Sequence, residues 1–252
     1  MVIITELTHS SHPDHVLKLT NRIETPYKCD GCKEQGFHPC YQCHENGCDF
    51  HLHEHCAKAD HSAPITHAFF DNIRFIFHNN FRPQSRISLS FCVACGKSVQ
   101  GFKYQSFCGK AHVIHPCCLN LPLALSAPQG DQEVKLRLLK KSKYWPTSKC
   151  LRCQNRKISK DIHGWVYVST SGDFCYHVAC VQDLILDRWK TDQLQYPNGD
   201  PGRQTLQLAI EHNNLPQRKV RKIQWVVIKV ALHLLIGAIF GEAIGGIIDL
   251  IF

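Results

Sequence analysis

The sequence lacks several features that would place it in a familiar class. Its N-terminus, MVIITELTHSSHPDH, has neither a cationic region nor a sustained apolar run, so we recognise no secretory signal and expect a cytoplasmic protein with reduced thiols. The cysteine count of 15 is odd, which argues against a complete disulfide framework. No thioredoxin-like βαβ pattern surrounds any Cys-x2-Cys pair, which disfavours a thiol-redox protein. No segment has the ββα Cys2His2 spacing that reads the major groove of DNA.

What the chain has in excess is metal ligands. It carries 15 Cys and 17 His in 252 residues, more than a packed enzyme domain needs. The segments YKCDGC, CHENGCDF and HLHEHC supply three close pairs: Cys29/Cys32, Cys43/Cys48 and His53/Cys56. A Cys-x2-Cys pair lets two thiolates converge on one tetrahedral ion from a tight turn. We therefore expect small modules stabilised by structural zinc.

The ligand pattern is repeated. Three Cys-x2-Cys pairs are each followed by a His-x2-Cys pair after 24, 23 and 27 residues, counted from the first Cys to the His. The three sets are Cys29, Cys32, His53, Cys56; Cys92, Cys95, His115, Cys118; and Cys150, Cys153, His177, Cys180. The chain therefore carries three copies of one module.

Short apolar runs predict small sheets around these ligands. VLKL, FIF and VKLRLL precede the three Cys pairs and are typical of strands, whereas VACVQDLILDRW has apolar residues three and four apart and predicts a helix. A Pro- and Gly-containing linker and a short helix near Leu206–His212 follow. We expect tandem α+β zinc-finger modules at residues 9–60, 65–120 and 130–190 (the last degenerate), a linker at 191–224 and a hydrophobic helical tail at 225–252.

Five motifs extend the pattern to a known family. At YKCDGC, CDFHLHEHCA, ITHAFF, ACGKSVQGF and HPCCLNLP the chain resembles the divergent C-one family of plants, which has cysteine/histidine-rich zinc fingers of the phorbol-ester type. GWVYVSTSGDFCYHVACV is similar to that family's C-terminal repeat. The resemblance covers about residues 9–190 and implies tandem zinc modules used for binding and signalling. It also implies that each Cys-x2-Cys pair shares one zinc with the His-x2-Cys pair of the same module.

The resemblance further implies second zinc sites. In the first module this site would use His15, Cys43 and Cys48, with a closing ligand between His61 and His67; the Cys43/Cys48 spacing is two residues longer than the family's usual pair. In the second module Ser106 stands where the family usually has Cys. The second zinc site of this module would then consist of Cys108 together with Cys117, His112 or His67. In the third module Ser171 stands at an expected ligand position, so we expect no second site there and interpret Cys175 as a buried small hydrophobe.

Several functions compete. Four Cys/His ligands per site close the coordination shell, which favours structural zinc over catalysis, so we expect a scaffold with a protein partner and no enzyme activity. The alternative is a nucleic-acid-binding regulator, because the net charge is +8 and Tyr104, Phe107, Tyr144 and Trp145 would stack bases if exposed. These aromatics would otherwise be core residues. A diacylglycerol site would need an apolar loop lip, and residues 33–41 supply none.

Two basic segments and the tail give further clues. Residues 135–149 hold six Lys and Arg, which form either a phosphate-binding surface or a solvated strand face. A second cluster, RKVRK at 218–222, precedes the apolar run from Val226 to Phe252, in which Gly237, Gly241 and Gly245 recur every fourth residue. This combination predicts a C-terminal membrane anchor. The alternative is a Gly-rich helical hairpin packed on the domain or on another copy, since the run also contains Glu242.

Overall fold

A computed structural model describes most of the first 195 residues and a short piece of the tail. The described ranges are 5–20, 26–37, 39–59, 62–79, 90–106, 111–129, 132–140, 149–159, 162–170, 172, 174–195, 230–232 and 234–239. The chain divides into two compact units, residues 1–93 with 97–121 and residues 94–96 with 122–252. The first unit contains almost all of modules one and two.

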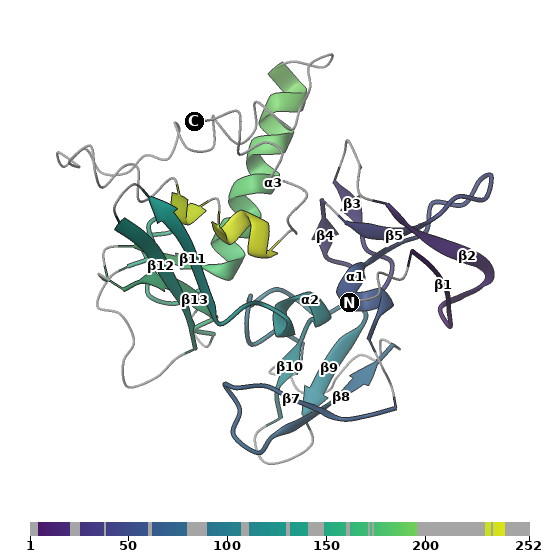
Figure 1. Ribbon diagram of the computed structural model, residues 1–252, viewed down its shortest axis with the longest axis horizontal. Coiled ribbons are helices and arrows are strands. Elements are labelled where there is room, and N and C mark those ends of the chain that lie inside the picture. Colours follow the sequence, from purple (N-terminus) through teal and green to yellow (C-terminus); the bar gives the residue numbers. More distant parts are fainter. Residues whose placement is uncertain are drawn as a thin grey trace. The chain divides into compact units, whose positions relative to one another are not determined.

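Module one is a four-stranded antiparallel sheet with a separate two-stranded ribbon (Figure 1). The sheet order is β1 (Glu6–His9), β2 (His12–Thr20), β5 (Cys40–Cys43) and β6 (His51–His53), and the ribbon pairs β3 (Tyr27–Lys28) with β4 (Gln35–Gly36). The helix α1 (Glu54–Ala57) follows β6 directly. Leu17, Tyr41 and Leu52 are fully buried and form the apolar centre of this small module.

Module two repeats the plan. Its sheet is a meander of β7 (Ile65–Thr66), β8 (Arg74–His78), β9 (Lys103–Ser106) and β10 (Val113–Ile114), and α2 (Pro116–Leu119) follows β10. Pro116 occupies the first turn of α2, where its missing N–H is not needed. The buried side chains of Phe75 and Phe77 alternate with exposed neighbours along β8, as a half-buried strand requires.

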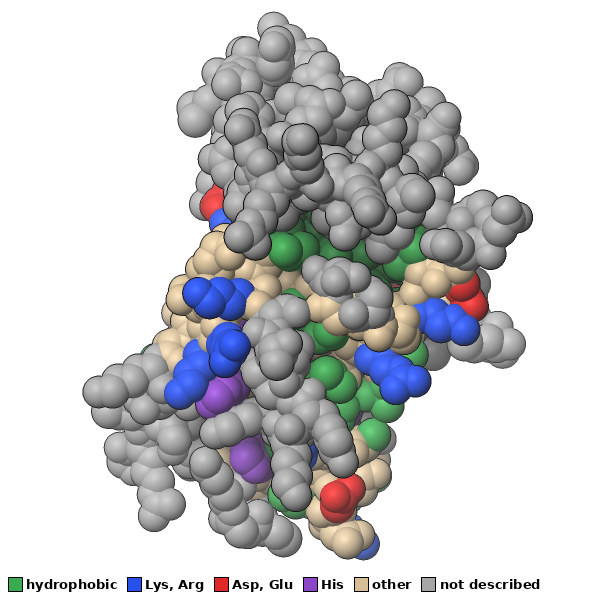
Figure 2. All heavy atoms as spheres, turned by 90° about the vertical axis from the view of Figure 1, so that its left-hand side faces the viewer, with side chains coloured by type: hydrophobic (Ala, Val, Ile, Leu, Met, Phe, Trp, Pro, Cys, Tyr) green, Lys and Arg blue, Asp and Glu red, His purple; other side chains and the backbone are tan. Residues whose placement is uncertain are grey.

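Module three contains the longest of the described helices. Its antiparallel sheet runs β11 (Ala124–Gln129), β12 (Gln132–Leu139), β13 (Val166–Ser169) and β14 (Cys175–His177), and α3 (Val178–Gln195) follows β14. Along β12, Val134, Leu136 and Leu138 are buried while Lys135 and Arg137 are exposed. The described part of the basic segment thus forms a solvated strand face. Figure 2 shows described Lys and Arg side chains on one face of the molecule, interspersed with apolar ones.

The strand and helix predictions for the modules are confirmed. VLKL lies in β2, FIF in β8 and VKLRLL in β12, while VACVQDLILDRW forms the first part of α3. The sheets extend beyond two of the expected module bounds, because β1 begins at Glu6 and β11 at Ala124. Three predicted segments lie outside the described residues: the linker, the helix near residues 206–212 and the basic cluster at 218–222.

Only a short part of the tail is described. Residues 230–232 and 234–239 are helical, and Ala231, Leu232, Leu235 and Ile236 are buried. Among the described residues no helix is long and apolar enough to cross a membrane.

Candidate metal centres

Four clusters of Cys and His side chains are positioned to hold metal ions. In each cluster four ligand atoms, one from each residue, lie within 4.8 Å of one another. We call three of them sites one, two and three, after their modules, and the fourth the hairpin site. They consist of Cys29, Cys32, His53, Cys56 (site one); Cys92, Cys95, His115, Cys118 (site two); Cys150, Cys153, His177, Cys180 (site three); and His12, His15, Cys43, Cys48 (hairpin site).

The same tight turn presents the Cys-x2-Cys pair in all three modules. The amide of the first Cys donates to the carbonyl five residues later, from Cys29 to Glu34 at 3.0 Å, from Cys92 to Lys97 at 2.9 Å and from Cys150 to Asn155 at 3.1 Å. The residue before that acceptor has a positive φ in each case, and these residues are Lys33, Gly96 and Gln154. The left-handed residue reverses the chain so that both sulfurs point to the same side.

A strand-to-helix junction presents the second pair. His53 and His177 end β6 and β14, His115 is the N-cap of α2, and each helix begins at the next residue. The second ligand follows three residues after the His, one helical turn along. Residues at this spacing lie on the same side of the helix start, so the imidazole and the thiol converge.

The distances fit a tetrahedral zinc ion. Zn–S bonds of about 2.3 Å and Zn–N bonds of about 2.05 Å at a tetrahedral angle place sulfur and nitrogen about 3.6 Å apart. The Nδ1 atom of His53 lies 3.3 Å from the sulfur of Cys32 and 3.9 Å from that of Cys56. The Nδ1 atom of His177 lies 3.4 Å from Cys153 Sγ and 3.7 Å from Cys180 Sγ. Thiolate and imidazole donors in this arrangement match the ligand preference of zinc.

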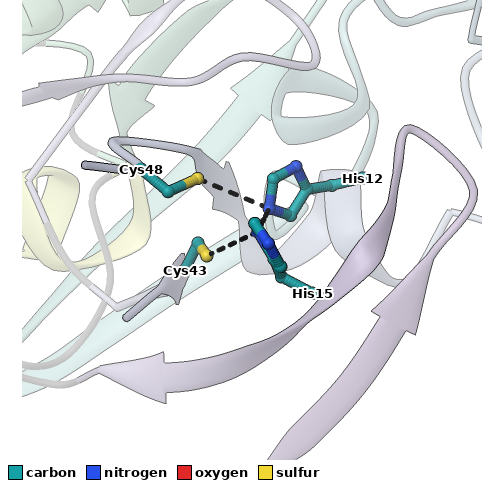
Figure 3. Close-up of side chains that lie close together, drawn as sticks. All are labelled: His12, His15, Cys43 and Cys48. Carbon is teal, nitrogen blue, oxygen red and sulfur yellow. Dashed lines mark hydrogen bonds between the residues drawn. The ribbon is translucent and has the colours of Figure 1, made fainter. Parts of the chain in front are cut away.

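The hairpin site uses two strands of module one (Figure 3). His12 and His15 lie on β2, Cys43 ends β5, and Cys48 follows in the next turn. Cys43 Sγ is 3.6 Å from His15 Nδ1, Cys48 Sγ is 3.5 Å from His12 Nε2, and the two ring nitrogens are 3.1 Å apart. A zinc ion at this position would join the β1–β2 hairpin to the rest of the sheet.

The closing ligand of the hairpin site differs from the sequence prediction. We expected it between His61 and His67, but the fourth ligand atom comes from His12. His67 instead accepts a hydrogen bond from the amide of Phe69 at its Nδ1, at 3.1 Å. The HPDH motif places His12 and His15 three residues apart at one end of a long strand, where the neighbouring β5 brings Cys43 within reach. The sequence carried this signal, because two His flank the start of the first apolar run.

Two expectations concern second sites in the later modules. Cys108 lies outside the described residues, and the clusters found among the described residues include none of Cys117, His112 and His67. In module three Cys175 is buried with Val166 and Val168 in the apolar cluster of the sheet, as predicted. Burial raises the pKa of the Cys175 thiol to about 12, which keeps this side chain a neutral thiol.

In sites one and three the ligand thiols have strongly shifted pKa values. A hydrogen bond from Cys180 favours the thiolate form of Cys150, and His177 adds to this effect. Together they lower the pKa of Cys150 to about 3, although burial opposes ionisation. In site one, burial would raise the pKa of Cys29, but hydrogen bonds from Cys32 and Cys56 hold it well below its usual value. Sites one and three thus each favour one thiolate, the form that binds zinc, and metal binding would deprotonate the remaining ligand thiols.

Comparisons with known proteins agree with this geometry. Residues 10–57 match the family model of the C1 domain, and this range contains both site one and the hairpin site. C1 domains bind zinc. Searches of curated proteins and of solved structures give no match to the chain.

Proposed function

We propose that this chain, whose first module belongs to the C1 family of cysteine/histidine-rich zinc fingers, is an intracellular scaffold that binds a protein partner in signalling. The observation that carries the proposal is the set of four Cys/His tetrads, three of them built on the same turn and helix junction. Tandem copies of one zinc-stabilised module present several rigid surfaces on a single chain. Such an arrangement suits recognition of a partner.

The same tetrads argue against catalysis by the zinc ions. A structural zinc has four protein ligands, whereas a catalytic zinc keeps a position open for water or substrate. In sites one, two and three each ion would be held by three thiolates and one imidazole, and in the hairpin site by two of each. We therefore propose a binding protein without enzyme activity of its own.

Two features favour a protein partner over a nucleic acid. Tyr104, one of the aromatics considered for base stacking, is only 5% exposed and so belongs to the core of module two. The described basic residues of β12, Lys135 and Arg137, alternate with buried Val134, Leu136 and Leu138, as on an ordinary solvated strand. No aromatic side chain of the described part of β12 accompanies these charges.

The experiment compares zinc-loaded full-length protein with protein treated with a chelator. We expect partner proteins identified by mass spectrometry to be captured by the first and lost from the second, because the surfaces depend on zinc. A parallel nucleic-acid binding assay at two salt concentrations tests the alternative. Tight binding with a steep salt dependence and no zinc-dependent protein partner would replace the scaffold proposal with a nucleic-acid function.

We also propose that the tail decides where the protein acts. The apolar run after the basic cluster at 218–222 supports a cytoplasmic protein attached to an intracellular membrane by its C-terminus. The buried side chains of Ala231, Leu232, Leu235 and Ile236 support the alternative of a tail packed on the protein. Membrane fractionation distinguishes the two.

A further inference from the structure

The three repeated sites differ in what the outer nitrogen of their histidine contacts. In site one Nε2 of His53 lies 3.3 Å from the backbone carbonyl of Gln35, within the same module. In site three Nε2 of His177 is buried and has no hydrogen-bond partner among the described residues. In site two Nε2 of His115 is buried too, and it lies 3.5 Å from a carboxylate oxygen of Glu34 of module one, at the distance of an ion pair rather than of a formed hydrogen bond. In site two the residue that contacts the outer nitrogen of the ligand histidine therefore comes from module one.

This contact is in a protected position. His115 is fully buried, and the Glu34 side chain is only 13% exposed. The second carboxylate oxygen of Glu34 lies 3.9 Å from Nζ of Lys97. Burial raises the pKa of the Glu34 carboxyl above its usual value, although His115 and Lys97 act in the opposite direction by stabilising the charged form. Exclusion of water strengthens the interaction of such a carboxylate with an imidazole N–H.

Glu34 also belongs to the ligand turn of site one. Its backbone carbonyl accepts the hydrogen bond from Cys29, and the next residue, Gln35, contacts His53. Lys97 has the equivalent position in module two, where its carbonyl accepts from Cys92. The residues that close the two turns thus form an oppositely charged pair between modules. In module three the equivalent residue is the neutral Asn155.

We propose that Glu34 positions His115 for metal binding and so couples the zinc affinity of site two to the folding of module one. The proposal rests on the function assigned above, in that both sites hold zinc. With Nδ1 of His115 on the metal, its Nε2 carries the proton and faces the Glu34 carboxylate at 3.5 Å. Closing this contact to a hydrogen bond on metal loading would fix the ring orientation and make the imidazole a better ligand. The turn around site one holds Glu34 in place for this contact. By thermodynamic linkage, loading of site two then stabilises the turn of site one.

The test uses the full chain with Glu34→Ala and Glu34→Gln. Cadmium-113 NMR of the cadmium-loaded proteins gives one resonance per site, and Cys118→Ser identifies that of site two. Release of zinc to a competing chelator gives the kinetic readout. Loss of an outer-shell partner typically lowers metal affinity about 10- to 100-fold, so we expect Glu34→Ala to accelerate release from site two by about tenfold or more. A glutamine oxygen at the same place can accept a hydrogen bond from Nε2–H in the metal-loaded protein, so Glu34→Gln should restore much of the loss.

The controls separate positioning from general stability. Glu6→Ala removes another module-one carboxylate, which pairs with Lys18 at the surface, and should leave site two unchanged. The resonance and release rate of site three should not respond to any Glu34 variant. Unchanged release in Glu34→Ala, or equal loss in the alanine and glutamine variants with a shift at site three, would overturn this inference while leaving the zinc scaffold intact. A parent protein that binds no metal would overturn the proposed function as well.

Discussion

The amide of Phe102 donates a 2.9 Å hydrogen bond to the carbonyl oxygen of Gly31, which lies between Cys29 and Cys32 in the ligand turn of module one. The approach is so close that a Cβ added at Gly101 would lie 1.9 Å from that oxygen, and one added at Gly31 would lie 2.5 Å from the Phe102 ring. His9 stacks on the Phe102 ring, with its ring centroid 5.8 Å from that of Phe102. The segment of module two that precedes β9 is therefore packed against the metal-binding turn of module one.

Gly101→Ala should destabilise this packing, because the new methyl group meets backbone rather than a movable side chain. We expect a loss of about 1–3 kcal/mol, in the range of overpacked sites, seen as a lower thermal midpoint of the zinc-loaded protein. The matched control is Gln100→Ala at the neighbouring exposed position, which should change the midpoint little. Equal midpoints for both variants would show that the two modules do not depend on this contact.

Zinc should be a requirement for folding. Modules of about fifty residues bury too little apolar surface for stability, whereas a structural zinc contributes roughly 10–16 kcal/mol at neutral pH. Elemental analysis should give at least four zinc ions per chain, one for each tetrad. A chelator should abolish the near-ultraviolet circular dichroism of the modules. Fewer than two ions per chain would contradict the assignment.

His12→Ala should remove one metal ion, since His12 supplies the fourth ligand of the hairpin site. In cobalt-loaded protein the loss should appear as a reduced charge-transfer and d–d absorption, because this site has two thiolates and two imidazoles. His67→Ala is the matched control and should keep the full metal content. The reverse result would return the closing ligand to the segment between residues 61 and 67.

Cys32→Ser and Cys175→Ser should have different effects on zinc. The first removes one of the four ligands of site one, so a zinc ion should be lost together with much of the stability of module one. The second places a hydroxyl in the apolar cluster with Val166 and Val168, which costs about 1–3 kcal/mol but leaves the zinc content unchanged. Zinc loss in both variants would reveal a second site in module three.

The tail prediction is tested by fractionation. If residues 226–252 form an anchor, full-length protein should sediment with membranes and resist carbonate extraction, and a chain ending at Gln217 should be soluble. Gly241→Leu should weaken association between helices without releasing the protein, since it blocks close approach while adding apolar surface. Full-length protein that remains soluble and monomeric would instead support the packed alternative.

Local chemistry made much of this protein predictable from its sequence. The Cys-x2-Cys and His-x2-Cys pairs were visible because each is formed by residues three apart on one turn, so their spacing survives in any tertiary setting. The strands VLKL, FIF and VKLRLL and the helix after His177 were predictable because their periodicity reflects the face that each element buries. These are properties of contiguous segments, and they determined the repeat, three of the four metal-ligand sets and the α+β modules.

What only the tertiary structure decided depends on register between segments distant in sequence. His12 joins Cys43 and Cys48 because β2 pairs with β5, with Leu17 opposite Cys43, and no local rule selects that register over one that uses His67. Glu34 meets His115 because module two packs on the ligand turn of module one, where Gly31 and Gly101 permit an approach that any side chain would block. The sequence shows which ligands are available, and the packing of one element on another determines which of these ligands share a metal ion.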